Sequence, residues 1–297
     1  MFNAREVIIF LERKNISYIF QGNIDFIVKG FSSINKPAIN TISWIKDVNK
    51  FNNPSPVFEE ILLVTNFGDN QIIKDYNVIF CENPKATFFE ILDNFFLKST
   101  RRNGYISPHA VVSSQSIGEG TVIGHNVYID KDVNIGKGVS IGNNVSIEGK
   151  VIIGDYSIIN SGSVIGKEGF GFYKDSNDNN KRVPHFGGVQ IGKNVEIGAN
   201  TCIDRGTIDN TIIEDNVKVG NLCQISHNVI VKSNSLVASG TIITGSTKIG
   251  KEVYIGPGTV VRNQIEVGNK SFVGMGAVVV KDVNPNTTVF GVPAREK

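Results

Sequence analysis

Residues 213–255 read IEDNVKVGNLCQISHNVIVKSNSLVASGTIITGSTKIGKEVYI, and an aliphatic residue returns at every sixth position. The period continues without a miss to residue 279. Its members are Ile213, Val219, Ile225, Val231, Val237, Ile243, Ile249, Ile255, Val261, Val267, Val273 and Val279. A six-residue period matches neither the turn of a helix nor the alternation of an ordinary strand, and it is typical of a hexapeptide β-solenoid.

A second series with the same spacing precedes this one. Its members are Val111, Ile117, Ile123, Ile129, Ile135, Ile141, Ile147, Ile153, Ile159 and Ile165. The residue two places earlier is often valine, as at Val127 and Val217, so each repeat offers two inward positions on one short strand. If about 18 residues form one triangular coil of three strands, the chain holds roughly eight to nine coils.

The composition is that of a globular protein: hydrophobic residues make up 40% of the 297 residues, and 18 of them are Phe. The net charge of +2, without a Lys/Arg block, argues against a nucleic-acid partner and a polybasic membrane anchor. Cys81, Cys202 and Cys223 form no CxxC motif, which fits a reducing compartment. The apolar run Val7–Leu11 is too short for a signal sequence or a membrane span, so we expect a cytoplasmic protein.

The N-terminal third has a different texture, with most of the Phe residues, the single Trp and no six-residue period. We expect a small α/β domain over residues 1–103, a solenoid domain over 104–283 and a tail over 284–297. In the first domain, we predict helices over Arg5–Lys14 and after Pro84, strands over Phe26–Val28, Ile61–Val64 and Val78–Phe80, and a helical turn just before the last strand.

The solenoid period fails at residues 166–190, where the sequence is rich in Gly, Asn, Asp and Lys. We predict a loop that leaves the coil. Loops of this length in a regular stack are functional or disordered, and the aromatic ends Phe170, Phe172 and His185–Phe186 favour function. The period resumes at Ile191 and slips once more near Asp204–Asn210.

Histidines are the main candidates for acid–base chemistry, since the repeats consist largely of Ile, Val and Gly. His125 and His227 both lie two residues after an inward Ile, and both begin the triplet HNV. A polar corner residue without a role is the ordinary interpretation, and we keep it for His125. His227, however, has Gly245 one coil above it, whose N–H could stabilise an oxyanion while neutral His227 removes a proton from an amine or hydroxyl. This pairing predicts acyl transfer.

Other chemistries lack their sequence signals. No two of the four His residues form a local cluster, so we expect no zinc site and no other bound metal or cofactor. The GFGF sequence at 169–172 lacks the strand–turn–helix context and the third Gly of a phosphate-binding loop. Ser and Cys nucleophiles have no His/Asp partner visible in the sequence.

Several longer segments resemble UDP-3-O-acylglucosamine N-acyltransferases of lipid A synthesis. They are GSVIGKEGFGF (162–172), VPHFGGVQIGKNVEIGANTCIDRGTIDNTII (183–213), NLCQISHNVIV (221–231) and ASGTIITGSTKIG (238–250). In the first domain, GFSSINKPAINTISWI (30–45) and FCENPKATFFEILDNFF (80–96) resemble that family's uridine-binding domain. The resemblance implies a left-handed parallel β-helix and a homotrimer with active sites in grooves between subunits.

The resemblance also implies roles for particular residues. His227 becomes the general base and Gly245 the oxyanion donor, and we place Asn228 and Asn263 at the substrate. Trp44 would stack on uracil, with Asp47 and Phe51 close by. The alternative for Trp44 is a half-buried core residue.

The chain departs from the family pattern at three places. Asp47 stands where the family usually has Asn, and Asn263 or Gln264 stands where it often has a second His. The chain stops at FGVPAREK rather than in a helical extension that helps hold acyl carrier protein. This ending favours acetyl-CoA as the donor. Its phosphates would meet Arg262, Lys281 and Arg295, for which solvated corner charges are the alternative.

We therefore expect an N-acyltransferase that moves an acyl group, acetyl from acetyl-CoA, to the amine of a UDP-linked amino sugar for surface polysaccharide or lipopolysaccharide synthesis. The alternative within this class is the lipid A enzyme, which uses a hydroxyacyl carrier protein thioester. The alternative from another class is a non-catalytic solenoid that binds a sugar nucleotide beside Trp44 and has no functional base.

Overall fold

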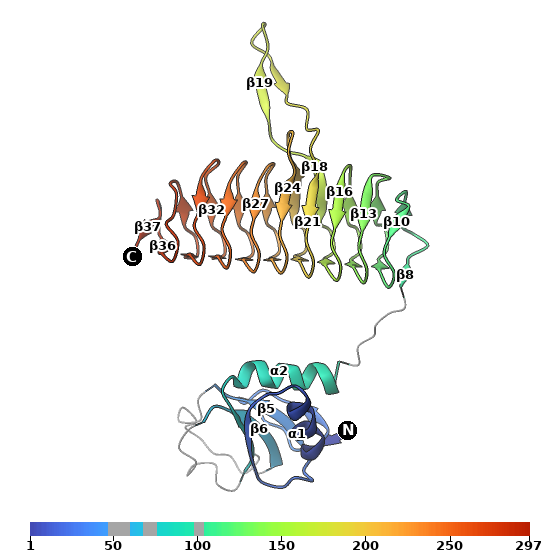
Figure 1. Cartoon of the computed structure of the whole chain (residues 1–297), viewed down its shortest axis with the longest axis vertical. Helices are drawn as coiled ribbons and strands as arrows, with labels where there is room; N and C mark the ends of the chain where they lie inside the picture. The colour runs from blue at the N-terminus through green and yellow to red at the C-terminus, as the bar shows by residue number, and fades with distance from the viewer. Residues whose placement is uncertain (47–59, 68–75, 98–103) are drawn as a thin grey trace. The chain divides into compact units, whose positions relative to one another are not determined.

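The structure, a computed structural model, describes residues 1–46, 60–67, 76–97 and 104–297, and it divides into two compact units, Met1–Arg101 and Arg102–Lys297 (Figure 1). The predicted boundary at residue 103 lies two residues from this division. Asp47, Phe51 and the stretch in which we predicted a helical turn up to residue 75 lie outside the described residues.

The first unit is an α/β domain built on a five-stranded sheet of order β2-β7-β6-β5-β4. Strands β4 to β7 pair in parallel, and β2 pairs antiparallel with β7. The elements are β1 (Phe2–Asn3), α1 (Ala4–Arg13), β2 (Tyr18–Gln21), β3 (Ile27–Val28), β4 (Gly30–Phe31), β5 (Thr41–Trp44), β6 (Ile61–Thr65), β7 (Asn77–Cys81) and α2 (Pro84–Phe95). The predicted helices and strands are all present, with ends that differ by one or two residues.

Side-chain hydrogen bonds cap the N-terminus of both helices. The Asn3 side chain and Glu6 form a capping box at α1, and Asn83 accepts from the Ala86 N–H at the start of α2. Pro84 occupies the first turn of α2, where its missing N–H costs nothing. Helix α2 then buries Phe88 and Ile91 in the same cluster as residues of β5, β6 and β7.

The second unit is a β-solenoid whose strands stack into three parallel sheets (Figure 1). The nine-stranded sheet contains β9 (Val111–Val112), β12 (Tyr128–Ile129), β15 (Ser146–Ile147), β18 (Val164–Glu168), β23 (Cys202–Arg205), β26 (Gln224–Ile225), β29 (Ile242–Ile243), β32 (Val260–Val261) and β35 (Val278–Val279). The eight-stranded sheet contains β10 (Ser116–Ile117), β13 (Val133–Ile135), β16 (Val151–Ile153), β21 (Val189–Ile191), β24 (Thr211–Ile213), β27 (Ile230–Val231), β30 (Lys248–Ile249) and β33 (Glu266–Val267). The eleven-stranded sheet contains β8 (Tyr105–Ile106), β11 (Val122–Ile123), β14 (Ser140–Ile141), β17 (Ile158–Ile159), β22 (Glu196–Ile197), β25 (Lys218–Val219), β28 (Leu236–Val237), β31 (Tyr254–Ile255), β34 (Phe272–Val273), β36 (Thr288–Phe290) and the antiparallel β37 (Arg295–Glu296).

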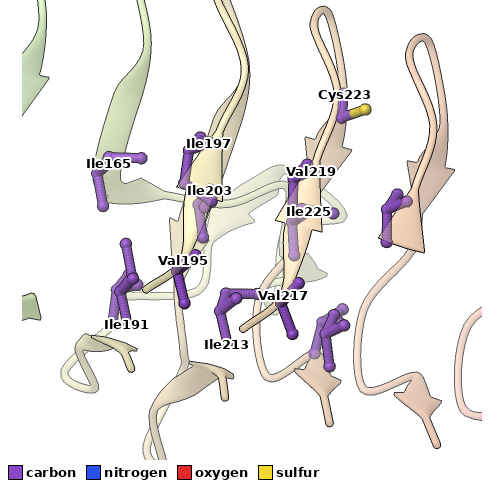
Figure 2. Packing of buried hydrophobic residues seen from close by; sticks show 14 of the residues in the cluster. Ile165, Ile191, Val195, Ile197, Ile203, Ile213, Val217, Val219, Cys223 and Ile225 are labelled. Carbon is purple, nitrogen blue, oxygen red and sulfur yellow. The ribbon is translucent and has the colours of Figure 1, made fainter. Parts of the chain in front are cut away.

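The strand register confirms the hexapeptide solenoid. Ile225 pairs with Ile243, and Ile243 with Val261, so each step along the stack is one 18-residue coil. Every member of the series from Ile213 to Val279 is buried, and Figure 2 shows such side chains packed inside successive coils. Because these aliphatic side chains are buried between successive coils, each coil is stabilised by its contacts with the neighbouring coils. The left hand of the coil stays a prediction.

One member of the predicted inward series is wrong. Val111 is 60% exposed, because β9 pairs with β12 so that Val112, not Val111, lies opposite the inward Ile129. The first coil is therefore shifted by one residue, and such a shift turns a strand's side chains to the other face. Ile117 packs against the core but is only partly buried.

Two interruptions appear where the period fails. Between β18 and β21 the chain leaves the coil, and part of it forms the hairpin β19 (Phe172–Lys174) and β20 (Asn180–Arg182), which Figure 1 shows projecting from the stack. Between β23 and β24 four extra residues enlarge one coil, so that Ile203 pairs with Ile225, 22 residues later. Part of the predicted C-terminal tail also continues the coil, since β36 pairs with β34.

Candidate active site

His227 lies at the corner that follows β26, and its imidazole is half-buried. Its Nδ1 lies 3.0 Å from Oδ1 of the next residue, Asn228. This Oδ1 also accepts the N–H and the hydroxyl of Thr207, while Nδ2 of the same amide donates to the Asp209 carbonyl. An amide oxygen only accepts, so Nδ1 of His227 must donate to it. The neutral imidazole then presents an unprotonated Nε2, the form that a general base requires.

The enlarged coil holds Asn228 in this orientation. Thr207 and Asp209 belong to the four-residue insertion after β23, and the Asn228 N–H donates to Thr211 Oγ1 at 2.9 Å. We expected Asn228 at the substrate. Its amide is engaged by Thr207, Asp209 and His227, and it orients the imidazole, while its contact with the substrate stays a prediction.

Gly245 lies one coil above His227, as the 18-residue step predicts. A Cβ built on Gly245 would lie 2.7 Å from Cε1 and 2.8 Å from Nε2 of His227. Any side chain at residue 245 would therefore collide with the imidazole. Glycine at residue 245 therefore allows the ring to occupy the space that a side chain would take.

The amide of Gly245 is one of several corner amides that no described residue caps, as are those of His227 and Asn263 in the same corner series. At seven corners, a backbone N–H is capped at 2.6–3.1 Å by an Asn, Asp or Ser side chain from the next coil. All seven follow strands of the eight- or eleven-stranded sheet. Asn263 occupies the corresponding capping place above Gly245, yet no described residue accepts the Gly245 N–H. The amide is therefore left available to a ligand.

A hollow of about 290 Å³ opens at this corner. Its lining residues are Phe170, Ser226, His227, Thr244, Gly245, Ser246, Asn263 and Gln264. It thus unites the predicted base, the predicted oxyanion donor and Asn263, and it adds Phe170 from the segment that precedes the hairpin. Its size suits the reacting part of a ligand rather than a whole sugar nucleotide.

Two further residues at this site were missed by sequence reasoning. The His185 ring contacts the His227 ring edge-on, with centroids 5.3 Å apart and planes at 77°. Asp204 accepts a hydrogen bond from Gln224 Nε2 at 2.9 Å. Burial raises the pKa of Asp204, against the opposing effects of that hydrogen bond and of the two imidazoles. Both residues lie where the hexapeptide period is interrupted, and His185 is one of the aromatic ends of residues 166–190 that favoured a functional loop, but the sequence assigned neither residue a role at His227.

The three predicted donor-binding cations lie on two different parts of the coil. Arg262 and Lys281 follow β32 and β35, so they lie on the same corner series as Gly245 and one and two coils beyond it, and Arg262 reaches the Val280 carbonyl at 3.4 Å. Arg295 lies instead on β37, at the end of the eleven-stranded sheet. This arrangement favours Arg262 and Lys281 over Arg295 as partners of one ligand.

His125 provides an internal comparison. It occupies the same position within HNV, but its Nδ1 contacts Ser107 Oγ at 2.8 Å, and its N–H is capped by Asn143. The corner above it therefore carries a capping side chain where His227 has a glycine. His125 has the place of a polar corner residue, as expected.

The first unit has a hollow of its own, of about 560 Å³. It is lined by Phe31, Ser32, Ser33, Ile34, Trp44, Ile45, Lys46, Phe88, Phe89 and Leu92. Trp44 is partly exposed and lies 6.4 Å from Phe88 between ring centroids, with the planes tilted by 36°. An aromatic wall with a few hydroxyls and one cation suits a flat, polar-edged ring such as a nucleobase.

Among the described residues, no three His, Cys, Asp or Glu side chains come together as a metal site. Within the same ranges, no helix is long and apolar enough to span a membrane.

Comparison with known families finds matches within the solenoid. The model described as bacterial transferase hexapeptide (six repeats) matches residues 132–167, 210–245 and 246–281, and the hexapeptide repeat of succinyl-transferase matches 188–221. The second unit is therefore a hexapeptide β-solenoid that is similar, over these stretches, to bacterial transferase hexapeptide repeats.

The chain is also similar to individual acyltransferases. It is 52% identical over 88 residues (30% of this chain) to UDP-3-O-acylglucosamine N-acyltransferase 2 of Legionella pneumophila strain Philadelphia 1, and 45% identical over 133 residues (45% of this chain) to that of strain Paris. These matches span only 25% and 38% of the relatives' own lengths. A UDP-N-acetylglucosamine acyltransferase from Bacteroides fragilis superposes with a TM-score of 0.59 at 26% identity, covering 65% of this chain and 74% of that one.

Proposed function

We propose that this protein is an N-acyltransferase that acylates the amine of a UDP-linked amino sugar. The observation that carries the proposal is that His227, with its Nδ1 against Asn228 Oδ1, and the uncapped Gly245 N–H lie at one hollow. The names of the similar proteins, UDP-3-O-acylglucosamine N-acyltransferases, support the reaction and the class of acceptor.

In the proposed reaction, the sugar amine attacks the carbonyl carbon of a thioester. His227 Nε2 removes a proton from the attacking nitrogen, and the Gly245 N–H donates to the oxygen that becomes negative. Collapse of the tetrahedral intermediate breaks the C–S bond, and the imidazolium returns the proton to the leaving sulfur. An amide and a free thiol are the products. The hydrogen bond to Asn228 stabilises the imidazolium while it exists.

The hollow beside Trp44 is the proposed uracil site, where the indole would stack on the base. Arg262 and Lys281 are the proposed partners of the donor phosphates. A homotrimer is proposed from the family resemblance, and sedimentation equilibrium would measure the mass of the assembly directly.

Two donors have to be compared. We assay acetyl-CoA and a hydroxyacyl carrier protein thioester against the same UDP-linked amino sugar, and follow the free thiol released. Turnover with only the carrier thioester would assign the chain to the lipid A reaction. Turnover with acetyl-CoA would assign it to an acetyltransferase of the same class.

The decisive variant is His227→Ala, which we expect to lower kcat by about 10²–10⁴-fold. His125→Ala is the matched control, because this residue has the same place in an HNV triplet but lies under a capped corner. The control should keep its activity. If His227→Ala turns over at nearly the wild-type rate, the proposed mechanism is wrong, and a binding role without catalysis becomes the better hypothesis.

A further inference from the structure

His185 contains the only buried side-chain nitrogen or oxygen in the described parts of the chain that has no hydrogen-bond partner, its Nε2. The residue is 4% exposed. Its Nδ1 lies 2.8 Å from the Val183 carbonyl, which can only accept, so Nδ1 carries the proton. Nε2 of the neutral ring is therefore a buried acceptor without a donor.

The ring is held rigidly in this position. The His185 N–H donates to Glu168 Oε1 at 3.2 Å, and the next residue, Phe186, donates its N–H to the Thr207 carbonyl at 2.8 Å. Thr207 also holds Asn228, so one short segment supports both imidazoles. An unsatisfied buried polar atom calls for a partner, and a ligand, an ion or an ordered water can supply one.

The Gly-Phe-Gly segment at 169–171 covers this place. A Cβ on Gly169 would lie 3.0 Å from Asp204 Oδ2, and one on Gly171 would lie 3.3 Å from His185 Cε1. Between them, Phe170 lines the hollow that contains His227. The two glycines thus allow this segment to pack closely against Asp204 and His185, where side chains would collide. This gives the GFGF sequence a structural place that is unrelated to phosphate binding.

We infer that His185 is a substrate-binding residue, and that its Nε2 accepts a hydrogen bond from a hydroxyl group of the ligand that is acylated or of the acyl chain that is transferred. The charged and titratable groups that face this place are Glu168, Asp204 and His227, with Arg182 paired to Glu168 at 4.0 Å. An unprotonated imidazole nitrogen accepts a hydrogen bond, so a hydroxyl donor suits His185 Nε2, while Arg182 is a donor at the edge of this place. This inference rests on the proposed function, because it takes that reaction's substrates as the ligands.

Two conservative substitutions distinguish the roles of the two ring nitrogens of His185. In His185→Asn, the amide replaces Nδ1 and its bond to Val183 but removes Nε2. In His185→Gln, the longer side chain places an amide near the position of Nε2. We expect His185→Asn to raise KM for the ligand that carries the hydroxyl by about 3- to 10-fold, with an unchanged melting temperature, and His185→Gln to restore most of the loss.

Substrates that lack one hydroxyl identify its source. We compare an acceptor lacking a sugar hydroxyl with an acyl donor lacking a chain hydroxyl. The substrate that lacks the hydroxyl bound by Nε2 should bind the wild type more weakly than the complete substrate, by the same factor as the His185→Asn substitution causes. The His185→Asn variant should bind this substrate and the complete substrate equally well. Identical constants for wild type and His185→Asn would overturn the inference alone. If both variants bind the substrate more weakly and both also have a lower melting temperature, His185 has a structural role and the inference is overturned.

The proposed function fails by a different result, namely no acyl transfer by the wild type with either donor. In that case, calorimetric titration of wild type and His185→Asn with the same UDP-linked amino sugar still measures this contact. A weaker Kd in the variant supports an acceptor role for Nε2 toward the sugar. The same titration with the hydroxyacyl thioester tests the acyl chain, and equal Kd values for both ligands overturn the inference.

Discussion

Gly245→Ala is the substitution for which the structure allows the most direct estimate. The new Cβ would lie 2.7 Å from His227 Cε1 and 2.8 Å from Nε2. Ordinary contact requires about 3.5 Å, so the imidazole must recede from residue 245 by roughly 0.7–0.8 Å, at the expense of its hydrogen bond to Asn228. The Gly245 N–H remains in the chain, so the variant tests the place of the base and not the loss of the oxyanion donor.

A misplacement of about 1 Å at a reacting group costs on the order of 10²-fold in rate. We therefore expect Gly245→Ala to lower kcat about 100-fold, which corresponds to about 2.7 kcal/mol of activation free energy. Because the half-buried ring can turn toward solvent, the free energy of unfolding should fall by only about 1 kcal/mol. Thiol release measures the rate, and denaturant titration measures the stability.

Two controls accompany this variant. Gly30→Ala adds a Cβ that meets only Thr41 Cγ2, at 3.7 Å, and should leave the rate unchanged. In a His227→Ala background, Gly245→Ala should cost less than about 2-fold more, since the colliding ring is gone. A rate within 3-fold of wild type for Gly245→Ala would refute the reasoning, and so would full additivity with His227→Ala.

Two further predictions concern the first unit and the buried carboxyl. Trp44→Ala should raise KM for the sugar nucleotide by about 10-fold or more while KM for the acyl donor stays unchanged, because stacking on a base contributes about 1–3 kcal/mol; equal acceptor KM values would remove the uracil assignment. Burial raises the folded pKa of Asp204, so this carboxyl destabilises the fold at pH values where it must ionise. Asp204→Asn should therefore raise the melting temperature at pH 7, and this gain should disappear as the pH falls below 3.8, the ordinary pKa of the carboxyl. Asp155→Asn is the control of opposite sign, because hydrogen bonding from the Lys137 N–H lowers the pKa of Asp155. The ionised carboxylate therefore stabilises the fold at neutral pH, and this stabilisation is lost as the pH falls through the folded pKa. Melting curves recorded across pH should show that Asp155→Asn is destabilising at pH 7. A pH-independent effect of Asp204→Asn would contradict the linkage argument.

The hexapeptide period carried most of the fold information. Because each coil has a constant length, residues 18 apart in sequence are neighbours in space, and this arithmetic was enough to place Gly245 above His227. The inward series from Ile213 to Val279 was readable for the same reason. At the end of the stack the rule was less certain, and Val111 was assigned to the wrong face because only one neighbouring coil constrains its register.

The site beyond that pair was not predictable in the same way. Asn228 reads as one more polar corner residue, and its role in orienting His227 depends on the four residues that enlarge the coil after β23. His185 approaches His227 only because the chain leaves the coil after Glu168 and returns at Val189. No spacing rule applies across such an excursion.

The sequence alone therefore determined the repeating architecture and the stacking of base and amide, because a fixed coil length converts sequence distance into spatial distance. Only the tertiary structure decided the tautomer of His227, the uncapped Gly245 amide above it and the proximity of Asp204 and His185 to the His227 ring. These depend on hydrogen bonds and ring contacts between segments whose separation in sequence follows no period. Side chains brought together by an insertion and a long excursion are specified by packing rather than by spacing.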